Sequence, residues 1–455
     1  MSQSSFSSLP ISENQSRFCE LTEQVLAYAR QLGATDAVVE VAENQGLSVA
    51  VRQQDIETIE QTRDRSLSVT VFAGNQRGSA SSSDFSWAAI QDTVAAAWHI
   101  ARYTAADPLA ALPDSEDLAL QYPHLGLYKP WLLDAGGAAR LALRTEQAAL
   151  EYSSLINNSE GASVDTNIGH FVLANSKGFL GGYPYSRYSI GASTLAGSGQ
   201  HMQRDYWYEV ARNPLQLASP EAIGQRAAQR TVARLGARRI KTGQYAVLFD
   251  ASLAAGLIGS LVRAASGGAL YRKNSFLVDQ LGQPVFAPHI QLTERPHVLA
   301  GQSSAPFDAE GVRTTDRTVV ADGVLQGYFL SSYTARKLGM HTTGNAGGSH
   351  NLYLHSSHTQ PTDDLAAMLK KLGTGLYVTE LMGQGINYLT GDYSRGAFGY
   401  WVENGEIQHP VEEITIASNL ATMFKHIDAI GADSINRGGK QTGSVLIASM
   451  SVAGD

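Results

Sequence analysis

The sequence predicts an α+β protein in which two small helix–sheet–helix units precede a large, mainly antiparallel β domain that encloses a buried helix. Helical spacing of apolar residues recurs before and after two runs of alternating strands. Short strands with glycine turn signals dominate the last half of the chain. One apolar segment, residues 251–266, interrupts them with helical spacing. A chain of 455 residues with 43% hydrophobic side chains is long enough for two or three domains.

The first predicted unit spans residues 14–104 and follows a segment, 1–13, that we expect to be disordered. Apolar residues at helical spacing predict a helix over residues 14–32, which Gly33 ends. The segments "DAVVEVAE", "GLSVAVRQQ", "IETIEQTR" and "SLSVTVF" then predict strands of an antiparallel sheet. Asp84 is predicted to cap a second helix that runs to Tyr103.

The second predicted unit spans residues 131–236 and is reached through a proline-containing linker, residues 105–130. It opens with an alanine-rich helix over residues 134–153. Strand-like segments follow, joined by a tight hairpin at Lys177-Gly178. A last helix, residues 219–235, carries Pro220 at its first position.

The third predicted domain covers residues 237–455. Asp250 or Ser252 is predicted to cap the helix that the domain encloses. Hairpin turns are predicted at Asp322-Gly323 and Asn404-Gly405, because these dipeptides favour the tight turns of hairpins. The remaining predicted helices are short and cover residues 332–338, 363–372 and 420–429.

Composition excludes some classes of function. The formal net charge of −8 argues against a protein that binds nucleic acid through bulk positive charge. The lone cysteine, Cys19, cannot form an intrachain disulfide and fits a reducing cytoplasm. The polar first residues predict no secretory leader, and no apolar run approaches the length of a membrane span.

No self-contained catalytic set is visible in the sequence. None of the 12 histidines is followed by glutamate, so the helical zinc-protease motif is absent. The densest group, His350, His355 and His358, lies in "SHNLYLHSSH", which we interpret as an exposed polar turn. A metal site built on these histidines is the alternative. The glycine-rich stretches "GNAGGSHN" and "GQGINYLTGDYSRG" lack the lysine and hydroxyl residue of a phosphate-binding loop.

Several stretches together resemble the PmbA branch, also called TldE, of the TldD/PmbA metalloprotease family. They include "RGSASSSD", "GGALYRKNSFL", "PFDAEGVRT", "TTGNAGG", "VTELMGQGIN" and "TGDYSRGAFGYWVENGEI". The resemblance implies a cytoplasmic zinc metalloprotease made of one TldD-type and one PmbA-type subunit. It also implies small unfolded or modified peptides as substrates, including precursors of peptide antibiotics. The family was formerly described as modulators of DNA gyrase.

The sequence departs from the zinc-binding pattern of that family. TldD-type subunits carry a helical H-E-x-x-x-H motif and a later cysteine as zinc ligands. The matching positions here fall near Ser260, Leu261 and Ala265, and the cysteine falls near residues 436–444. None of these residues replaces imidazole or thiolate as a zinc ligand. The resemblance therefore implies that catalysis and zinc belong to a TldD-like partner and that this chain completes the cavity, with no catalytic or metal-binding residue of its own.

The stretch from Gly383 to Arg395 is predicted to line this cavity or an interface. Its glycines allow another backbone to approach, and exposed strand edges beside them suit the addition of a peptide strand. Its candidate residues are Gly383, Gly385, Asp392, Tyr393 and Arg395. Arg272, Lys273 and Arg395 can bind a peptide carboxylate. The alternative is that Glu380 and Asp392 hold Arg395 in a structural ion pair.

Two other functions remain open from the sequence. One is a homodimeric hydrolase with its own site. The other is a regulatory protein that binds a partner such as a topoisomerase without proteolysis. The sequence does not say whether the isolated chain is a homodimer. We expect neither nucleic acid nor membrane among its partners.

Overall fold

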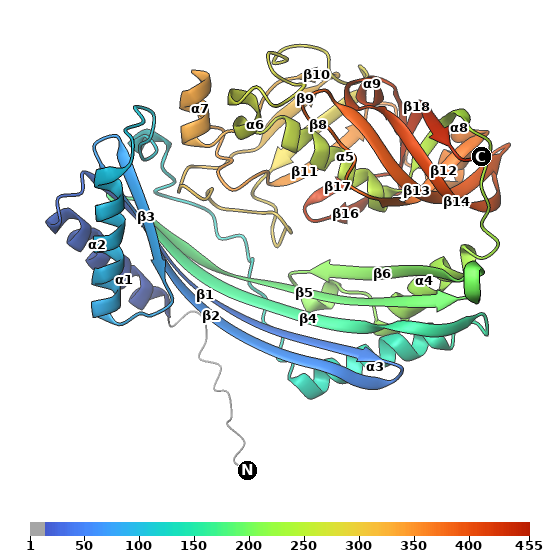
Figure 1. Ribbon diagram of the computed structural model, residues 1–455, viewed down its shortest axis with the longest axis horizontal. Helices are drawn as coiled ribbons and strands as arrows, with labels where there is room; N and C mark the ends of the chain where they lie inside the picture. The colour runs from blue at the N-terminus through green and yellow to red at the C-terminus, as the bar shows by residue number, and fades with distance from the viewer. Residues whose placement is uncertain (1–13) are drawn as a thin grey trace. The chain divides into compact units, whose positions relative to one another are not determined.

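The computed structural model describes residues 14–455, so the segment expected to be disordered, 1–13, lies outside the described residues. The structure confirms the mixed α+β class with mostly antiparallel sheets. The chain divides into two compact units (Figure 1). Unit 1 combines residues up to 196 with residues 204–231 and 306–313, and unit 2 combines residues 197–203, 232–305 and 314–455.

Unit 1 is built on one six-stranded sheet with the order β3-β2-β1-β4-β5-β6 (Figure 1). Its strands are β1 (Asp36–Arg52), β2 (Asp55–Ala73), β3 (Gln76–Ser82), β4 (Ile156–Asn175), β5 (Leu180–Ala196) and β6 (Gln203–Ala211). Strands from both predicted N-terminal units meet in it, because β1 pairs with β4 from Val38↔Asn175 to Val51↔Ala162. The domain boundaries drawn from the sequence stay a prediction.

Four helices of unit 1 pack on one face of this sheet. They are α1 (Asn14–Gln31), α2 (Trp87–Tyr103), α3 (Ala135–Leu150) and α4 (Pro220–Ala233). Alternate residues of a strand point to the same face. Accordingly, Val39 and Val41 of β1 pack with α1 and α2, while Val49 and Val51 pack with α3 and α4. The opposite face is covered at one end by part of the predicted linker and by Phe307.

One predicted helix cap is found in the structure and one is not. Asp250 accepts a hydrogen bond from Ser252 N at 2.9 Å, so this predicted cap is confirmed. Asp134 caps α3 in the same way by accepting a hydrogen bond from Gly137 N at 2.6 Å. The cap predicted at Asp84 is wrong, because Ser86 occupies that position in α2. Asp84 instead accepts a hydrogen bond from Ser86 N at 2.8 Å, and this bond lowers the pKa of its carboxyl group.

Unit 2 contains two six-stranded sheets, with the orders β10-β9-β8-β11-β17-β16 and β14-β13-β12-β7-β18-β15. Helix α5 (Ala251–Ala264) contacts β12 of one sheet and β16 and β17 of the other. It is the buried helix that the sequence predicts. The strands are β7 (Gly243–Phe249), β8 (Ile290–Arg295), β9 (Arg317–Ala321), β10 (Val324–Leu325), β11 (Asn351–Ser356), β12 (Gly375–Met382), β13 (Asp392–Glu403), β14 (Glu406–Asn419), β15 (Ile427–Ile430), β16 (Ile435–Arg437), β17 (Lys440–Thr442) and β18 (Val445–Ala453).

The turns and short helices of unit 2 can be compared one by one with those predicted from the sequence. Both predicted hairpins form, and Asp322 and Asn404 have the positive φ angles, 47° and 52°, that such turns require. The short helices are α6 (Gly267–Tyr271), α7 (Ser332–Leu338), α8 (Leu365–Leu372) and α9 (Leu420–Lys425). The helix predicted over residues 420–429 is therefore too long, because β15 begins at Ile427 and pairs with β18. None of the helices described for residues 14–455 is long and apolar enough to cross a membrane.

A buried histidine of β4 makes the stability of unit 1 depend on pH. His170 is 2% exposed and its ring stacks on Phe18 of α1 at 5.3 Å. Neither ring nitrogen has a hydrogen-bond partner among the described residues. Burial lowers the pKa of His170 below 6.5, although the charge of Glu43 opposes this shift. The folded chain therefore binds a proton less readily than the unfolded chain.

We expect the free energy of unfolding of unit 1 to fall as the pH drops below about 6.5, the usual pKa of histidine in an unfolded chain. The His170→Phe variant should lose this part of the pH dependence, because phenylalanine does not titrate. Urea unfolding at pH 7.5 and pH 5.5 measures the effect. His99→Phe, at an exposed position of α2, is the control. An equal loss of stability on acidification in wild type and His170→Phe would contradict the prediction.

Candidate functional site

The three positions matched to the family's zinc motif lie on or directly after α5. The Ser260 hydroxyl donates to Gly256 O at 3.0 Å, which satisfies it within the helix. Leu261 and Ala265 are both 0% exposed and belong to the main core of unit 2. Zinc requires nitrogen, thiolate or carboxylate ligands. These side chains supply one hydroxyl and two apolar groups, so this part of the chain does not fit the metal.

The stretch matched to the family's later cysteine lies beside the same helix. Helix α5 packs against β16 and β17, which belong to residues 435–442. Lys440 Cε lies 3.8 Å from the place that a Cβ atom on Gly259 would occupy. Burial lowers the pKa of the Lys440 amine. The fold thus brings the two matched stretches together, but it places a lysine there, and a protonated lysine has no lone pair for a metal.

The three histidines of "SHNLYLHSSH" do not converge. His350 is 7% exposed and its Nε2 atom lies 2.8 Å from Gly344 O. His355 and His358 are exposed, and the His358 ring stacks on His289 at 4.6 Å. The described residues contain no group of three or more histidine, cysteine, aspartate or glutamate residues that can hold a metal ion. The expected exposed turn is found only at residues 357–358, because residues 351–356 form β11, which lies between β8 and β17 inside a sheet.

The stretch from Gly383 to Arg395 folds back on itself. Ser394 N donates to Gly385 O at 2.7 Å, and a Cβ atom on Gly385 would lie 2.0 Å from Ser394 O, so a side chain does not fit there. Gly383 has a φ of +78°. The following strand, β13, pairs with β12 on one side and with β14 on the other. Since both of its edges are occupied, β13 offers no edge for the addition of a peptide strand.

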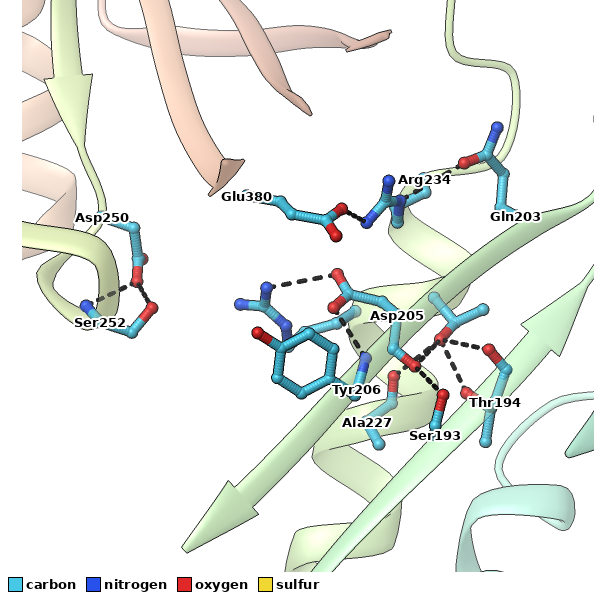
Figure 2. Close-up of polar contacts among 12 residues, drawn as sticks. Ser193, Thr194, Gln203, Asp205, Tyr206, Ala227, Arg234, Asp250, Ser252 and Glu380 are labelled. Carbon is cyan, nitrogen blue, oxygen red and sulfur yellow. Dashed lines mark hydrogen bonds and ion pairs between the residues drawn. The ribbon is translucent and has the colours of Figure 1, made fainter. Parts of the chain in front are cut away.

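The acidic candidates do not hold Arg395. Glu380 forms an ion pair with Arg234 (Figure 2). Asp392 accepts hydrogen bonds from Thr390 Oγ1 at 2.6 Å and Asn419 Nδ2 at 3.3 Å. Arg395 Nε donates to the backbone oxygen of Met382 at 3.2 Å. The structural ion pair considered for Arg395 is therefore wrong, since each acid has other partners.

The other candidates divide into exposed and buried residues. Arg272 and Lys273 are exposed at the end of α6, and the Arg272 guanidinium lies over the Tyr271 ring at 5.0 Å. Tyr393 is 3% exposed, and burial raises the pKa of its hydroxyl to about 12. Tyr393 is therefore a core residue of unit 2, whereas Arg272 and Lys273 remain accessible to a ligand.

Arg234 is a central residue of this site that the sequence does not reveal. Its guanidinium lies over the Phe398 ring at 3.7 Å, and its Nε donates to Gln203 Oε1 at 3.3 Å. Gln203 Nε2 in turn donates to Glu412 Oε2 at 2.7 Å. Figure 2 shows Arg234 between Glu380 and Gln203. Arg234 and Glu380 are 146 residues apart, so no local pattern signals their contact.

Removing the Glu380 carboxylate is expected to destabilise unit 2. The Arg234 side chain is only 9% exposed and would lose its ion pair, so Glu380→Ala should lower the free energy of unfolding by about 1.5–3 kcal/mol. Urea unfolding measures the change. Glu413→Ala, which removes an exposed ion pair with Arg239, is the control and should leave the midpoint nearly unchanged. Equal midpoints for Glu380→Ala and wild type would show that the ion pair contributes nothing.

The chain is similar in sequence to known proteins along most of its length. Residues 37–101, 128–235 and 242–454 match three PmbA/TldA metallopeptidase families, namely domain 1, the central domain and the C-terminal domain. The chain is 45% identical over 438 residues to Metalloprotease PmbA of Escherichia coli O157:H7, covering 96% of each chain.

Two solved structures share the fold. One is a Bacteroides thetaiotaomicron protein described as a modulator of DNA gyrase, with a TM-score of 0.90, 26% identity and coverage of 96% of this chain and 98% of that chain. The other is TldE from Thermococcus kodakarensis, with a TM-score of 0.81 and coverage of 95% and 100%. At 17% identity the second likeness concerns the fold alone.

Proposed function

Because the chain belongs to the PmbA/TldD metallopeptidase family, we propose that it is the non-catalytic subunit of a two-chain zinc peptidase. In this proposal the zinc ion and the groups that activate water belong to a TldD-like partner. This chain binds that partner and completes the cavity in which a small unfolded or modified peptide is cleaved. The lone Cys19 favours the cytoplasm as the place where the complex works.

The packing around α5 is the observation that supports this assignment most directly. Leu261 and Ala265 fill the core at the positions matched to the glutamate and to one zinc ligand of a catalytic subunit, and Lys440 lies beside the helix. Water activation by zinc requires a metal with an open coordination position and a nearby base. Neither the residues on α5 nor those on β16 and β17 supply such a set.

In this proposal, the role of this chain is to bind and orient the peptide and the partner subunit. Arg272 and Lys273 are exposed cations that suit a carboxylate of the peptide or the partner. Met382 at the end of β12 and Leu389 of the folded-back loop are 45% and 53% exposed and suit apolar contacts. These groups would hold a substrate or a subunit in place, and the bond would be broken by groups of the partner.

Reconstitution with a TldD-like chain from the same organism tests the proposal. Each chain is purified alone, the two are mixed, and complex formation, zinc content and cleavage of a fluorogenic peptide are measured. We expect no stoichiometric zinc and no cleavage for this chain alone, and faster cleavage by the mixture than by the partner alone. A partner variant without its motif glutamate is the control and should leave the mixture inactive.

Three results would overturn the proposal. Stoichiometric, tightly bound zinc in this chain alone would show a metal site of its own. Cleavage by this chain alone would show an independent hydrolase. A mixture that is no more active than the partner alone would contradict the cavity-completing role, and complex formation without a gain in cleavage would favour a regulatory binding protein.

A further inference from the structure

A pocket of about 420 Å³ opens on the face of the unit 1 sheet that faces away from the four helices. Its lining comes from unit 1 alone. The lining residues are Asn167, Phe171, Tyr183, Tyr185, Arg187 and Arg212. The pocket therefore combines aromatic rings with two guanidinium groups. No residue predicted from the sequence to bind peptide lies in it.

The strand register explains why these side chains share one pocket. On β4 and β5 the opposed pairs are Asn167↔Arg187, Gly169↔Tyr185 and Phe171↔Tyr183. Residues two apart in a strand point to the same face, so both rows project together. Arg212 directly follows β6, the neighbour of β5 in the sheet. Five of the six lining residues thus belong to the regular strands β4 and β5, and Arg212 lies in the bend after β6.

Gly169 gives the pocket its shape. A Cβ atom at this position would lie 2.2 Å from the Tyr185 ring and 2.4 Å from Asn44 Oδ1. The Tyr185 ring therefore lies across β4, and its hydroxyl donates to Asn44 Oδ1 of β1 at 2.6 Å. Phe171 and Tyr183 meet edge to face at 4.7 Å. These contacts fix the aromatic wall before any ligand arrives, which reduces the entropy lost on binding.

The two arginines give the pocket a positive charge. Arg212 is 9% exposed, and its NH1 group donates to Ser186 O at 3.3 Å. Burial lowers the pKa of Arg212, and the nearby charge of Arg187 adds to this shift. Two neighbouring guanidinium groups attract an anion that enters the pocket. The negative charge of Glu40 of β1 also raises the pKa of Tyr185, after the larger effect of burial.

We infer that this pocket binds the C-terminal carboxylate of a short peptide through Arg187 and Arg212, with the last side chain packed on the aromatic wall of Phe171, Tyr183 and Tyr185. Guanidinium groups recognise carboxylates with paired hydrogen bonds. Asn167, opposite Arg187, supplies an amide for the peptide backbone. The choice of a peptide rests on the proposed function, whereas the choice of a carboxylate rests on the pocket itself.

Binding to the isolated full-length chain tests the inference without any peptidase readout. The probe is the acetylated tetrapeptide Ac-Ala-Ala-Ala-Phe with a free carboxylate, titrated by calorimetry against its C-terminal amide, against Ac-Ala-Ala-Asp-Phe-amide and against inorganic phosphate. We expect the free carboxylate to bind at least about tenfold more tightly than the amide, because hydrogen bonds to charged groups contribute at this level. The internal aspartate and the phosphate should bind no better than the amide.

Substitutions in the pocket test which side chains bind the carboxylate. Arg187→Gln and Arg212→Gln should each weaken binding of the free carboxylate about tenfold or more. Arg204→Gln, an exposed arginine of β6 that pairs with Glu160, is the matched control and should not change it. Glu40→Gln should tighten binding, because it removes a negative charge. Since Arg187 is exposed, Arg187→Gln should fold normally even if Arg212→Gln does not.

Four outcomes overturn the inference. They are no binding of the free-carboxylate peptide at millimolar concentration, equal binding of the amide, equal binding of phosphate, and unchanged affinity in folded Arg187→Gln. The reconstitution assay is separate. Carboxylate binding without a gain in cleavage would support the inferred carboxylate site and contradict the proposed subunit role. A gain in cleavage without carboxylate binding would contradict the inferred carboxylate site alone.

Discussion

Replacing Leu261 with glutamate, the residue that the family's zinc motif carries in TldD-type subunits, is expected to unfold unit 2 or lower its free energy of unfolding by at least about 4 kcal/mol. Leu261 is 0% exposed and contacts the main core of the unit. A carboxylate there would lose its hydration without gaining a cation or hydrogen-bond donors from the apolar side chains around it. The same substitution would be tolerated if α5 were a vestigial metal site with open space.

The pH dependence of Leu261→Glu separates a buried charge from a simple packing defect. Burial raises the pKa of a carboxyl group in the folded state above its unfolded value of about 4.3. The folded variant therefore gains stability relative to wild type as the pH falls toward that value and loses it as the pH rises. Circular dichroism during urea unfolding at pH 5 and pH 8 measures this.

Leu261→Met provides the matched control, because it keeps the volume and should cost less than about 1.5 kcal/mol. If Leu261→Glu were as stable as Leu261→Met at pH 8, the position would not belong to the core. In that case the packing argument against a metal site on α5 would fail, and the proposed division of labour between the subunits would need another basis.

Local sequence signals predicted the elements of this fold well. The predicted cap at Asp250 gave the start of α5, the alanine-rich pattern gave α3, and the Asp-Gly and Asn-Gly pairs gave two hairpins. These features depend on residues within one turn or one hairpin of each other. One error has a local cause and the other a cause farther along the chain. Ser86, two residues after Asp84, is the N-cap of α2. After Lys425 the chain forms β15, which pairs with β18, in place of the predicted helix.

The candidate site was less predictable because its contacts join distant segments. The sequence suggested that Glu380 holds Arg395, which is close in the chain, but Glu380 binds Arg234 from α4's C-terminal end. The polar pattern of residues 350–358 suggested an exposed turn, yet β11 is paired on both sides. A signal for the carboxylate pocket did exist. The alternation of Tyr183, Tyr185 and Arg187 places two aromatic residues and a cation on one face of a strand.

Replacing Glu294 with alanine is expected to lower the free energy of unfolding of unit 2 by about 3–5 kcal/mol, the range found when one partner of a buried ion pair is removed. Glu294 of β8 is 1% exposed. Its Oε2 atom accepts from Arg317 Nε at 2.6 Å. Its Oε1 atom accepts from Asn345 Nδ2 at 2.9 Å and from His350 N at 2.6 Å. One carboxylate therefore satisfies three donors, of which two are buried.

The three donors that Glu294 accepts from determine which further changes are expected. Glu294→Ala should also increase hydrogen exchange at the His350 amide, because the loop over residues 344–350 loses the acceptor that fixes it. Glu406→Ala, at an exposed position of β14, is the control and should change neither quantity. The double variant Glu294→Leu with Arg317→Met should recover part of the loss, since it no longer buries the Arg317 charge without this carboxylate.

A small loss of stability in Glu294→Ala, together with unchanged exchange at His350, would mean that water replaces the carboxylate at little cost. The position would then be loosely packed and the glycine-rich stretch from Gly344 would be held by other contacts. The expected large loss would instead explain this stretch without a ligand. Its glycines and Asn345 let the chain wrap closely around one buried acid, so a sequence that looks like a binding loop serves to complete the core of unit 2.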